Sequence, residues 1–118
     1  MFKTTRQIGN SGENLACKYL ISQGYKIITR NYTIRGGEID IIAKEDEELV
    51  FVEVKLRFGN KYGYAREAIT PWKLVSLHKT ALFYIQKINW GNKPYRFDLL
   101  AIDYDSKGES TIELLRNI

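Results

Sequence analysis

Two short segments carry acidic and basic side chains in a pattern that could perform hydrolytic chemistry. Residues 37–43 contain Asp40, and residues 49–55 contain Glu53 and Lys55. Apolar and polar residues alternate in both segments, as is typical of β-strands. The four polar residues between them predict a hairpin loop. The sequence therefore predicts two adjacent strands that bring two carboxylates and one lysine together.

The pairing of these strands follows from their apolar residues. A register symmetrical about the loop places apolar residues opposite one another on one face, in the pairs Ile39–Val54, Ile41–Val52 and Ala43–Val50. On the other face Asp40 lies opposite Glu53, and Glu38 lies opposite Lys55. A shift of one residue would turn the apolar side chains away from each other. Like charges directly opposed in a sheet are destabilising, and a divalent cation would offset that repulsion.

This set of residues fits metal-dependent phosphodiester hydrolysis. Carboxylate oxygens bind Mg²⁺ or Mn²⁺, so we expect Asp40 and Glu53 to be ligands, with the backbone carbonyl of Val54 as a third. Lys55 would orient and help to deprotonate the attacking water and would stabilise the developing negative charge. The alternative is a salt-bridged, solvated strand face, because Glu-x-Lys is common on strands. The residues alone favour neither over the other.

Glu13 lies near the start of a predicted helix over residues 11–23. It could bind the metal or a metal-bound water. Alternatively, with Asn10 as the N-cap, Glu13 would occupy the third helical position and accept a hydrogen bond from the N-cap amide.

Basic and aromatic residues follow the second strand, in a predicted mobile loop over residues 57–64. Arg57, Lys61 and Tyr62, with Lys73 on the next helix, form a mixture that suits phosphate contacts and base stacking. We expect these four residues to bind nucleic acid. The alternative is an ordinary polar loop.

The length and charge of the chain limit the possible functions. With 118 residues, it is expected to form a single domain over residues 1–118. The net charge of +4 mildly favours a polyanionic partner. One cysteine, Cys17, excludes an internal disulfide, and no apolar run approaches the length of a membrane span. We expect a cytoplasmic protein that does not interact with membranes.

The remaining elements complete an α/β fold. Strands are predicted over residues 25–32, 95–104 and 110–115, and a second helix begins after the N-cap Thr70 and ends near residue 88. Trp72, His78 and Trp90 are assigned to packing. This order predicts a mixed sheet of about five strands flanked by helices.

The chain resembles the bacterial YraN family in a series of spaced motifs. The resemblance rests on the following residues and segments: Gly12-Glu13, Ala16, Tyr19-Leu20, Gly24-Tyr25, Ile27, Arg30-Asn31, residues 37–43, residues 51–57, Ala68, Lys73, Ala81 and Arg96-Phe97-Asp98. It covers residues 9–103. The sequence departs from two related patterns. Ile39 stands where the motif of the PD-(D/E)xK nuclease superfamily has proline, and Leu56 stands where a small polar residue is more usual in the family.

The resemblance implies a restriction-endonuclease-like fold of the PD-(D/E)xK nuclease superfamily, similar to archaeal Holliday-junction resolvases. It implies that Glu13, Asp40, Glu53 and Lys55 form the active site of a Mg²⁺- or Mn²⁺-dependent endonuclease that acts on DNA, with branched or damaged DNA among its substrates. The analogy with resolvases also suggests a homodimer. Two alternatives stay open: a non-catalytic nucleic-acid-binding module, and a subunit that acts through a protein partner.

Overall fold

The computed structural model describes residues 5–59 and 65–118. Within these ranges, the elements in chain order are α1 (Thr5–Ser22), β1 (Lys26–Ile34), β2 (Gly37–Glu45), β3 (Glu48–Phe58), the short 3₁₀ helix η1 (Ala65–Ala68), α2 (Pro71–Lys87), β4 (Tyr95–Tyr104) and β5 (Ser110–Leu115). Lys61 and Tyr62, two of the predicted nucleic-acid contacts, lie outside the described residues.

The described strands form one five-stranded mixed sheet in the order β1-β2-β3-β4-β5. The β3–β4 pair is parallel, and the other neighbouring pairs are antiparallel. The chain passes from β3 to β4 through η1 and α2, as parallel strands require a crossover connection. This confirms the predicted α/β architecture and is consistent with a restriction-endonuclease-like fold.

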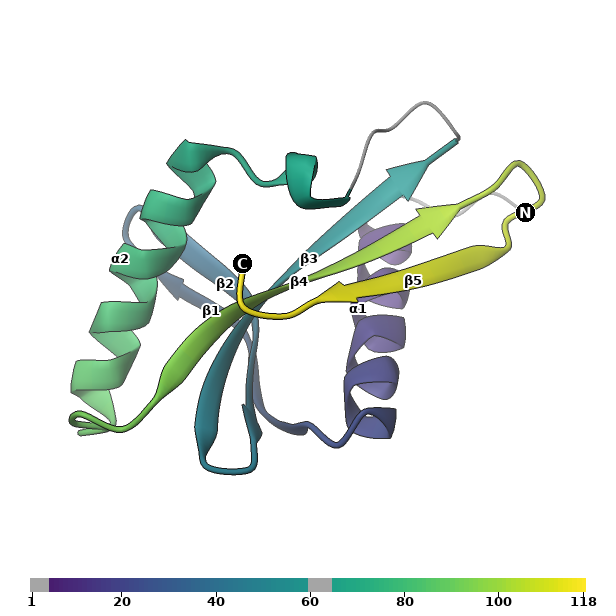
Figure 1. Cartoon of the computed structure of the whole chain (residues 1–118). Coiled ribbons are helices and arrows are strands. Elements are labelled where there is room, and N and C mark those ends of the chain that lie inside the picture. Colours follow the sequence, from purple (N-terminus) through teal and green to yellow (C-terminus); the bar gives the residue numbers. More distant parts are fainter. Residues whose placement is uncertain (1–4, 60–64) are drawn as a thin grey trace.

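The two described α-helices cover opposite faces of the sheet (Figure 1). On one face, α1 packs through Ala16 and Leu20 against alternate residues of β2, β3 and β4. On the other face, α2 contributes Leu77, Ala81, Tyr84 and Ile85 to a second apolar cluster. The sheet is therefore buried on both sides, which holds the central strand β3 in a fixed position.

Helix α2 approaches β2 closely at one point. A Cβ atom at Gly37 would lie 2.0 Å from Thr80 Oγ1, so only glycine fits there. The predicted start of α2 is confirmed: the backbone N–H of Lys73 donates to the hydroxyl of the N-cap Thr70 at 3.1 Å, and Pro71 is the first helical residue. The first contact holds the middle of α2 close to β2, and the second defines the start of the helix.

Helix α1 starts earlier than the sequence predicted. It begins at Thr5 rather than at residue 11, and Gly24 follows it with a positive φ of 95°. Glu13 therefore lies in the middle of the helix, and its alternative assignment to an N-terminal cap is wrong. Residues 5–10 carry no apolar periodicity that would have shown the extension.

Two of the three aromatic residues assigned to packing differ from expectation. Trp72 is 83% exposed, because its position in the first turn of α2 points away from the sheet. His78 is also exposed, although its ring stacks on Phe97 with centroids 4.1 Å apart. Trp90 packs against the apolar cluster between the sheet and α2, as predicted.

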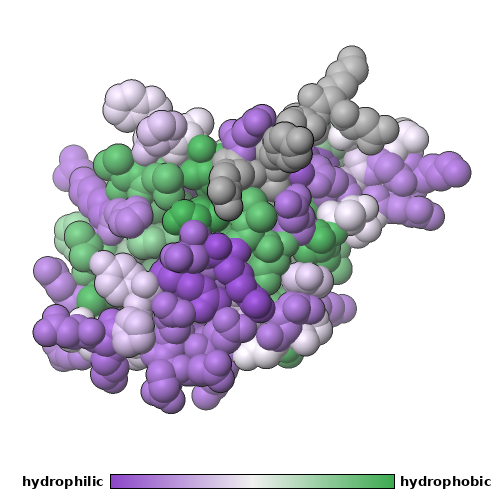
Figure 2. All heavy atoms as spheres, viewed as in Figure 1, coloured by the Kyte–Doolittle hydropathy of each residue, from purple (hydrophilic) through white to green (hydrophobic). Residues whose placement is uncertain are grey.

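Figure 2 shows the molecule from the same side as Figure 1. An apolar band crosses this side, above a hydrophilic region.

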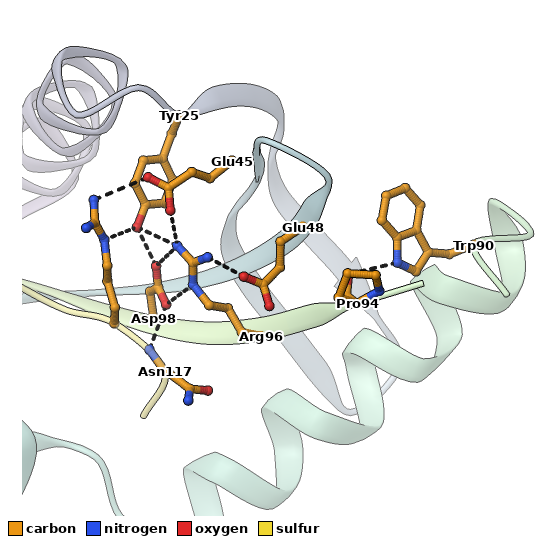
Figure 3. A network of polar contacts seen from close by, with 9 residues as sticks. Tyr25, Glu45, Glu48, Trp90, Pro94, Arg96, Asp98 and Asn117 are labelled. Atoms are coloured by element: carbon orange, nitrogen blue, oxygen red, sulfur yellow. Dashed lines mark hydrogen bonds and ion pairs between the residues drawn. The ribbon is translucent and has the colours of Figure 1, made fainter. Parts of the chain in front are cut away.

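A buried polar network fixes the hairpin end of the sheet (Figure 3). Asp98 on β4 is fully buried and accepts hydrogen bonds from Tyr25 Oη at 2.6 Å and from Arg96 Nε at 3.0 Å. Arg96 also contacts Glu48 and Glu45, at 2.6 and 2.7 Å. Every charged group of the network has a partner, which offsets the cost of burying it. The network joins the β2–β3 turn to β4, and Asp98 also accepts the backbone N–H of Asn117.

No helix among residues 5–59 and 65–118 is both long enough and apolar enough to span a bilayer.

Candidate active site

The predicted register of the β2–β3 hairpin is confirmed over its paired residues. The pairs are Ile41–Val52, Ile42–Phe51, Ala43–Val50, Lys44–Leu49 and Glu45–Glu48. The regular pairing ends at Ile41 and Val52. Beyond this point the side chain of Asp40 replaces the backbone of β2, because Asp40 Oδ2 accepts the backbone N–H of Val54 at 2.8 Å. Asp40 therefore occupies a break in the hydrogen-bonded ladder.

The two sides of this break face opposite layers of the protein. Ile39 packs in the apolar cluster between the sheet and α2, whereas Ile41 and Ala43 pack in the cluster between the sheet and α1. The expectation that all three share one face is therefore wrong. Residues two apart normally point to the same face, so the strand turns over at Asp40. As a result the Asp40 carboxylate points towards the backbone of β3, rather than standing above a face of the sheet.

Glu53 is the buried acid of the site. It is only 8% exposed, and its Oε2 atom has no hydrogen-bond partner among the described residues. Burial, followed by the negative charge of Asp40, raises the pKa of the Glu53 carboxyl from 4.5 to about 7, while Lys73 and Lys55 act in the opposite direction. A buried carboxylate oxygen without a partner costs free energy unless a cation or proton satisfies it.

Asp40 shares this environment. Burial raises the pKa of its carboxyl, and the Val54 N–H and the charge of Lys73 oppose this effect. The charges of Glu38 and Glu13 raise it further. Perturbed carboxyl groups of this kind are frequent at functional sites.

Lys73 was expected to contact nucleic acid, but the structure brings it to Glu53. Its Nζ atom lies 3.5 Å from Glu53 Oε1. One signal in the sequence could have indicated this contact. A lysine in the first turn lies at the positive end of the helix dipole, where a cation is unfavourable without an acidic neighbour. The first turn of α2 contains no acidic residue, so the partner comes from the sheet.

Lys55 follows Glu53 by two residues on β3 and is exposed. Its charge lowers the pKa of Glu53, which places the two groups in one electrostatic environment. An exposed ammonium group beside a buried carboxylate is open to a substrate that approaches from solvent.

Glu13 is oriented by β1. Its Oε1 atom accepts hydrogen bonds from Arg30 Nε and Asn31 Nδ2, both at 2.9 Å. Asn31 has a positive φ of 54°, which marks a local irregularity in β1. Glu13 therefore contributes negative charge near Asp40 while being held by a neighbouring strand.

The site offers two carboxylates rather than a larger group of metal-ligating side chains. No group of three or more His, Cys, Asp or Glu residues is arranged to hold a metal within residues 5–59 and 65–118. Magnesium, however, is commonly bound through one or two carboxylates, with waters and substrate oxygens completing its shell. Asp40 and Glu53 provide two carboxylates, and the Glu53 Oε2 atom has no hydrogen-bond partner among the described residues.

Arg57 does not belong to a loop, contrary to the prediction. It lies within β3, is 8% exposed and pairs with Asp103 on β4 through an Nε–Oδ1 contact of 2.7 Å and an Nη2–Oδ2 contact of 2.7 Å. The strand continues to Phe58 because it pairs with β4 along this length. The guanidinium of Arg57 is thus engaged within the sheet, which weakens its assignment as a nucleic-acid contact.

Comparison with known proteins identifies relatives of the whole domain. The model of a family described as "Uncharacterised protein family UPF0102" matches residues 12–102. A UPF0102 protein of Caldicellulosiruptor saccharolyticus is 43% identical over 113 residues, which is 95% of this chain and 96% of the relative. UPF0102 proteins of Clostridium tetani and Symbiobacterium thermophilum are 41% and 39% identical, also over at least 93% of each chain. The chain therefore belongs to the UPF0102 family, the YraN family that its motifs resemble.

Proposed function

We propose that this protein is a metal-dependent endonuclease that hydrolyses phosphodiester bonds in DNA. The observation that carries the proposal is the pair formed by Asp40 and Glu53 at the break between β2 and β3. One carboxylate is fixed by the Val54 N–H, and the other is buried with an unpartnered oxygen. A buried acidic pair beside two lysines costs stability, and this cost has a functional reason if the pair binds a cation and a phosphate.

Each residue has a role in this chemistry. Asp40, Glu53 and the Val54 carbonyl would hold Mg²⁺ or Mn²⁺, which supplies a Lewis acid and a more acidic water. Lys55 orients the water and adds positive charge near the phosphate. Glu13, held by Arg30, adds negative charge around the site and so favours cation binding. The positive charge stabilises the transition state because phosphodiester hydrolysis increases the negative charge on the phosphate oxygens.

DNA is the substrate that best fits the charge of the protein. The net charge is +4, and the two lysines of the site lie on the solvent side of the buried acids. Positive charge around a carboxylate pair attracts a polyanion that the pair alone would repel. Branched or damaged DNA remains the preferred substrate class in this proposal, on the resemblance to resolvases.

The test is cleavage of labelled single-stranded, duplex, flapped and four-way DNAs with Mg²⁺ or Mn²⁺. Asp40→Asn and Lys55→Ala are expected to lose cleavage while remaining folded. Glu109→Gln removes an exposed carboxylate from the β4–β5 turn and should cleave like the wild type. The same variants also exclude a contaminating nuclease, which no substitution in this chain would affect.

Two outcomes would contradict the proposal. Retained cleavage in both Asp40→Asn and Lys55→Ala would show that the site is elsewhere. Salt-dependent DNA binding without cleavage of any substrate would favour the non-catalytic nucleic-acid-binding module instead.

A further inference from the structure

The position of Lys73 differs from that of an ordinary surface lysine. Its backbone is fixed, because its N–H donates to the N-cap Thr70 in the first turn of α2. Its side chain extends back to the sheet and ends 3.5 Å from Glu53 Oε1. The lysine side chain is 40% exposed, whereas that of Glu53 is 10% exposed. One partner of the ion pair is therefore fixed and buried, and the other has access to solvent.

The ion pair is not needed to attach α2 to the sheet. The helix is already held by the apolar side chains of Leu77, Ala81 and Tyr84, and by the close approach of Thr80 to Gly37. At the first turn, the ammonium group is also opposed by the helix dipole. The contact between Lys73 and Glu53 therefore points to a role at the site rather than to a role in packing.

A divalent cation and the Lys73 ammonium would compete for the same carboxylate. Glu53 has one oxygen beside Lys73 and one without a partner, only a few ångströms apart within a single carboxylate group. Two positive charges at that separation repel each other strongly in a partly buried site. The long, flexible stem of lysine allows the ammonium to leave without any change in the helix.

We propose that Lys73 is a displaceable counter-ion of Glu53. It neutralises the acidic pair when no metal is bound, and when a metal binds it turns to solvent and contacts a phosphate of the DNA. This inference rests on the proposed function, because it assumes that Glu53 is a metal ligand. It assigns to Lys73 a substrate-binding role that is linked to metal binding.

The first experiment measures Mn²⁺ binding by calorimetry at pH 8.0 in the absence of DNA. Lys73→Met removes the ammonium but keeps most of the apolar stem, and it should bind Mn²⁺ roughly three- to tenfold more tightly because a competing cation has been removed. Lys79→Met is the matched control: it changes the same charge on an exposed position of the same helix and should bind Mn²⁺ like the wild type.

The second experiment measures DNA binding with Ca²⁺ in place of Mg²⁺, so that binding can be observed without turnover. Lys73→Met should bind DNA more weakly, and its dependence on salt should be smaller by about one phosphate contact. Circular dichroism should show unchanged helix content, because the N-cap contact involves only the backbone of residue 73.

The outcomes separate this inference from the function on which it rests. Mn²⁺ binding by the wild type, with equal or weaker binding by Lys73→Met, would overturn the displacement model and leave the nuclease proposal intact. Tighter Mn²⁺ binding by Lys73→Met without any loss of DNA affinity would overturn the proposed contact between Lys73 and a DNA phosphate. Absence of Mn²⁺ binding by the wild type would contradict the proposed metal site and this inference together.

Discussion

The carboxylate of Asp40 accepts the backbone N–H of Val54, the residue that follows Glu53, at 2.8 Å. This single contact replaces a backbone hydrogen bond that β2 and β3 do not form beyond Ile41 and Val52. The same contact fixes one acid of the candidate site. It also accounts for the change of face between Ile39 and Ile41. The structural and functional roles of Asp40 are therefore joined in one hydrogen bond, and substitutions can separate them.

Asp40→Asn and Asp40→Ala should differ in stability although both remove the charge. Asparagine keeps a side-chain oxygen that accepts the Val54 N–H, so we expect its free energy of unfolding to stay within about 1 kcal/mol of the wild type. Alanine leaves that N–H without an acceptor and should lower the free energy of unfolding by about 1–3 kcal/mol. Urea unfolding at pH 7.5 measures both values. Equal stabilities for the two variants would show that the hydrogen bond contributes little.

Glu53 should make the stability of the protein depend on pH. Burial raises the pKa of its carboxyl from 4.5 to about 7 in the folded protein. Because the folded state then binds the proton more tightly, the stabilisation from protonated Glu53 is complete below about pH 4.5 and is lost as the pH rises to about 7. At 1.36 kcal/mol for each pKa unit, the loss approaches roughly 3 kcal/mol.

Glu53→Gln is the control for this titration, since glutamine has a similar shape and stays neutral. We expect the free energy of unfolding of the wild type to fall relative to that of Glu53→Gln between pH 4.5 and 7, and the difference to become constant above this range. Urea unfolding at half-unit intervals of pH would show the trend. Parallel curves for the two proteins would contradict a raised pKa at Glu53.

Most of the fold could be predicted because local signals agree with the tertiary structure. The alternating residues of β2 and β3 set the register from Ile41 to Val52, and Thr70-Pro71 marks the start of α2. The start of α1 could not be predicted, because residues 5–10 lack an apolar stripe. The loop predicted from residue 57 was also wrong in its first part, since pairing with β4 extends β3 to Phe58.

The sequence could pair the two acids of the site but could not give their geometry. Alternation predicts that Asp40 stands on a face of the sheet, whereas the end of the ladder turns it towards Val54. The contact between Lys73 and Glu53 depends on how the β3–β4 crossover places α2. The lack of an acidic residue in the first turn of α2 indicates that Lys73 needs a partner, but it does not identify Glu53 as that partner. Arg57 and Asp103 are likewise joined only by the parallel register of β3 and β4.

The buried network around Asp98 should contribute strongly to stability. Asp98 is fully buried and neutralises Arg96 while accepting the Tyr25 hydroxyl. Asp98→Asn would leave the largely buried Arg96 guanidinium with only Glu45 and Glu48 as acidic partners, and we expect the free energy of unfolding to fall by about 3–5 kcal/mol. Glu113→Gln, an exposed carboxylate on the neighbouring strand β5, should change it by no more than about 0.5 kcal/mol. Chemical unfolding would test both, and a change of less than about 1 kcal/mol in Asp98→Asn would contradict the inferred role.

The close approach of α2 to β2 can be tested at Gly37. A Cβ atom there would lie 2.0 Å from Thr80 Oγ1, so Gly37→Ala must either turn the Thr80 side chain or move α2 away from the sheet. We expect it to lower the free energy of unfolding by about 1–3 kcal/mol, as overpacking does. A movement of α2 should also reduce any DNA cleavage, because this helix carries Lys73. Adding Thr80→Ala removes the clashing oxygen, so the double variant should regain about 1 kcal/mol or more relative to the sum of the single changes.

Gly36→Ala is the matched control for this cycle. Gly36 has a φ of 88° and no atom within 4 Å of an added Cβ, so alanine there strains the backbone without meeting Thr80. The decrease in the free energy of unfolding caused by Gly36→Ala should therefore add to that caused by Thr80→Ala, with no coupling energy between the two. Urea unfolding of the three single and two double variants gives both coupling energies. Equal coupling in the two cycles would show that the cost at Gly37 comes from the backbone of the turn, and that α2 is not held to β2 by this contact.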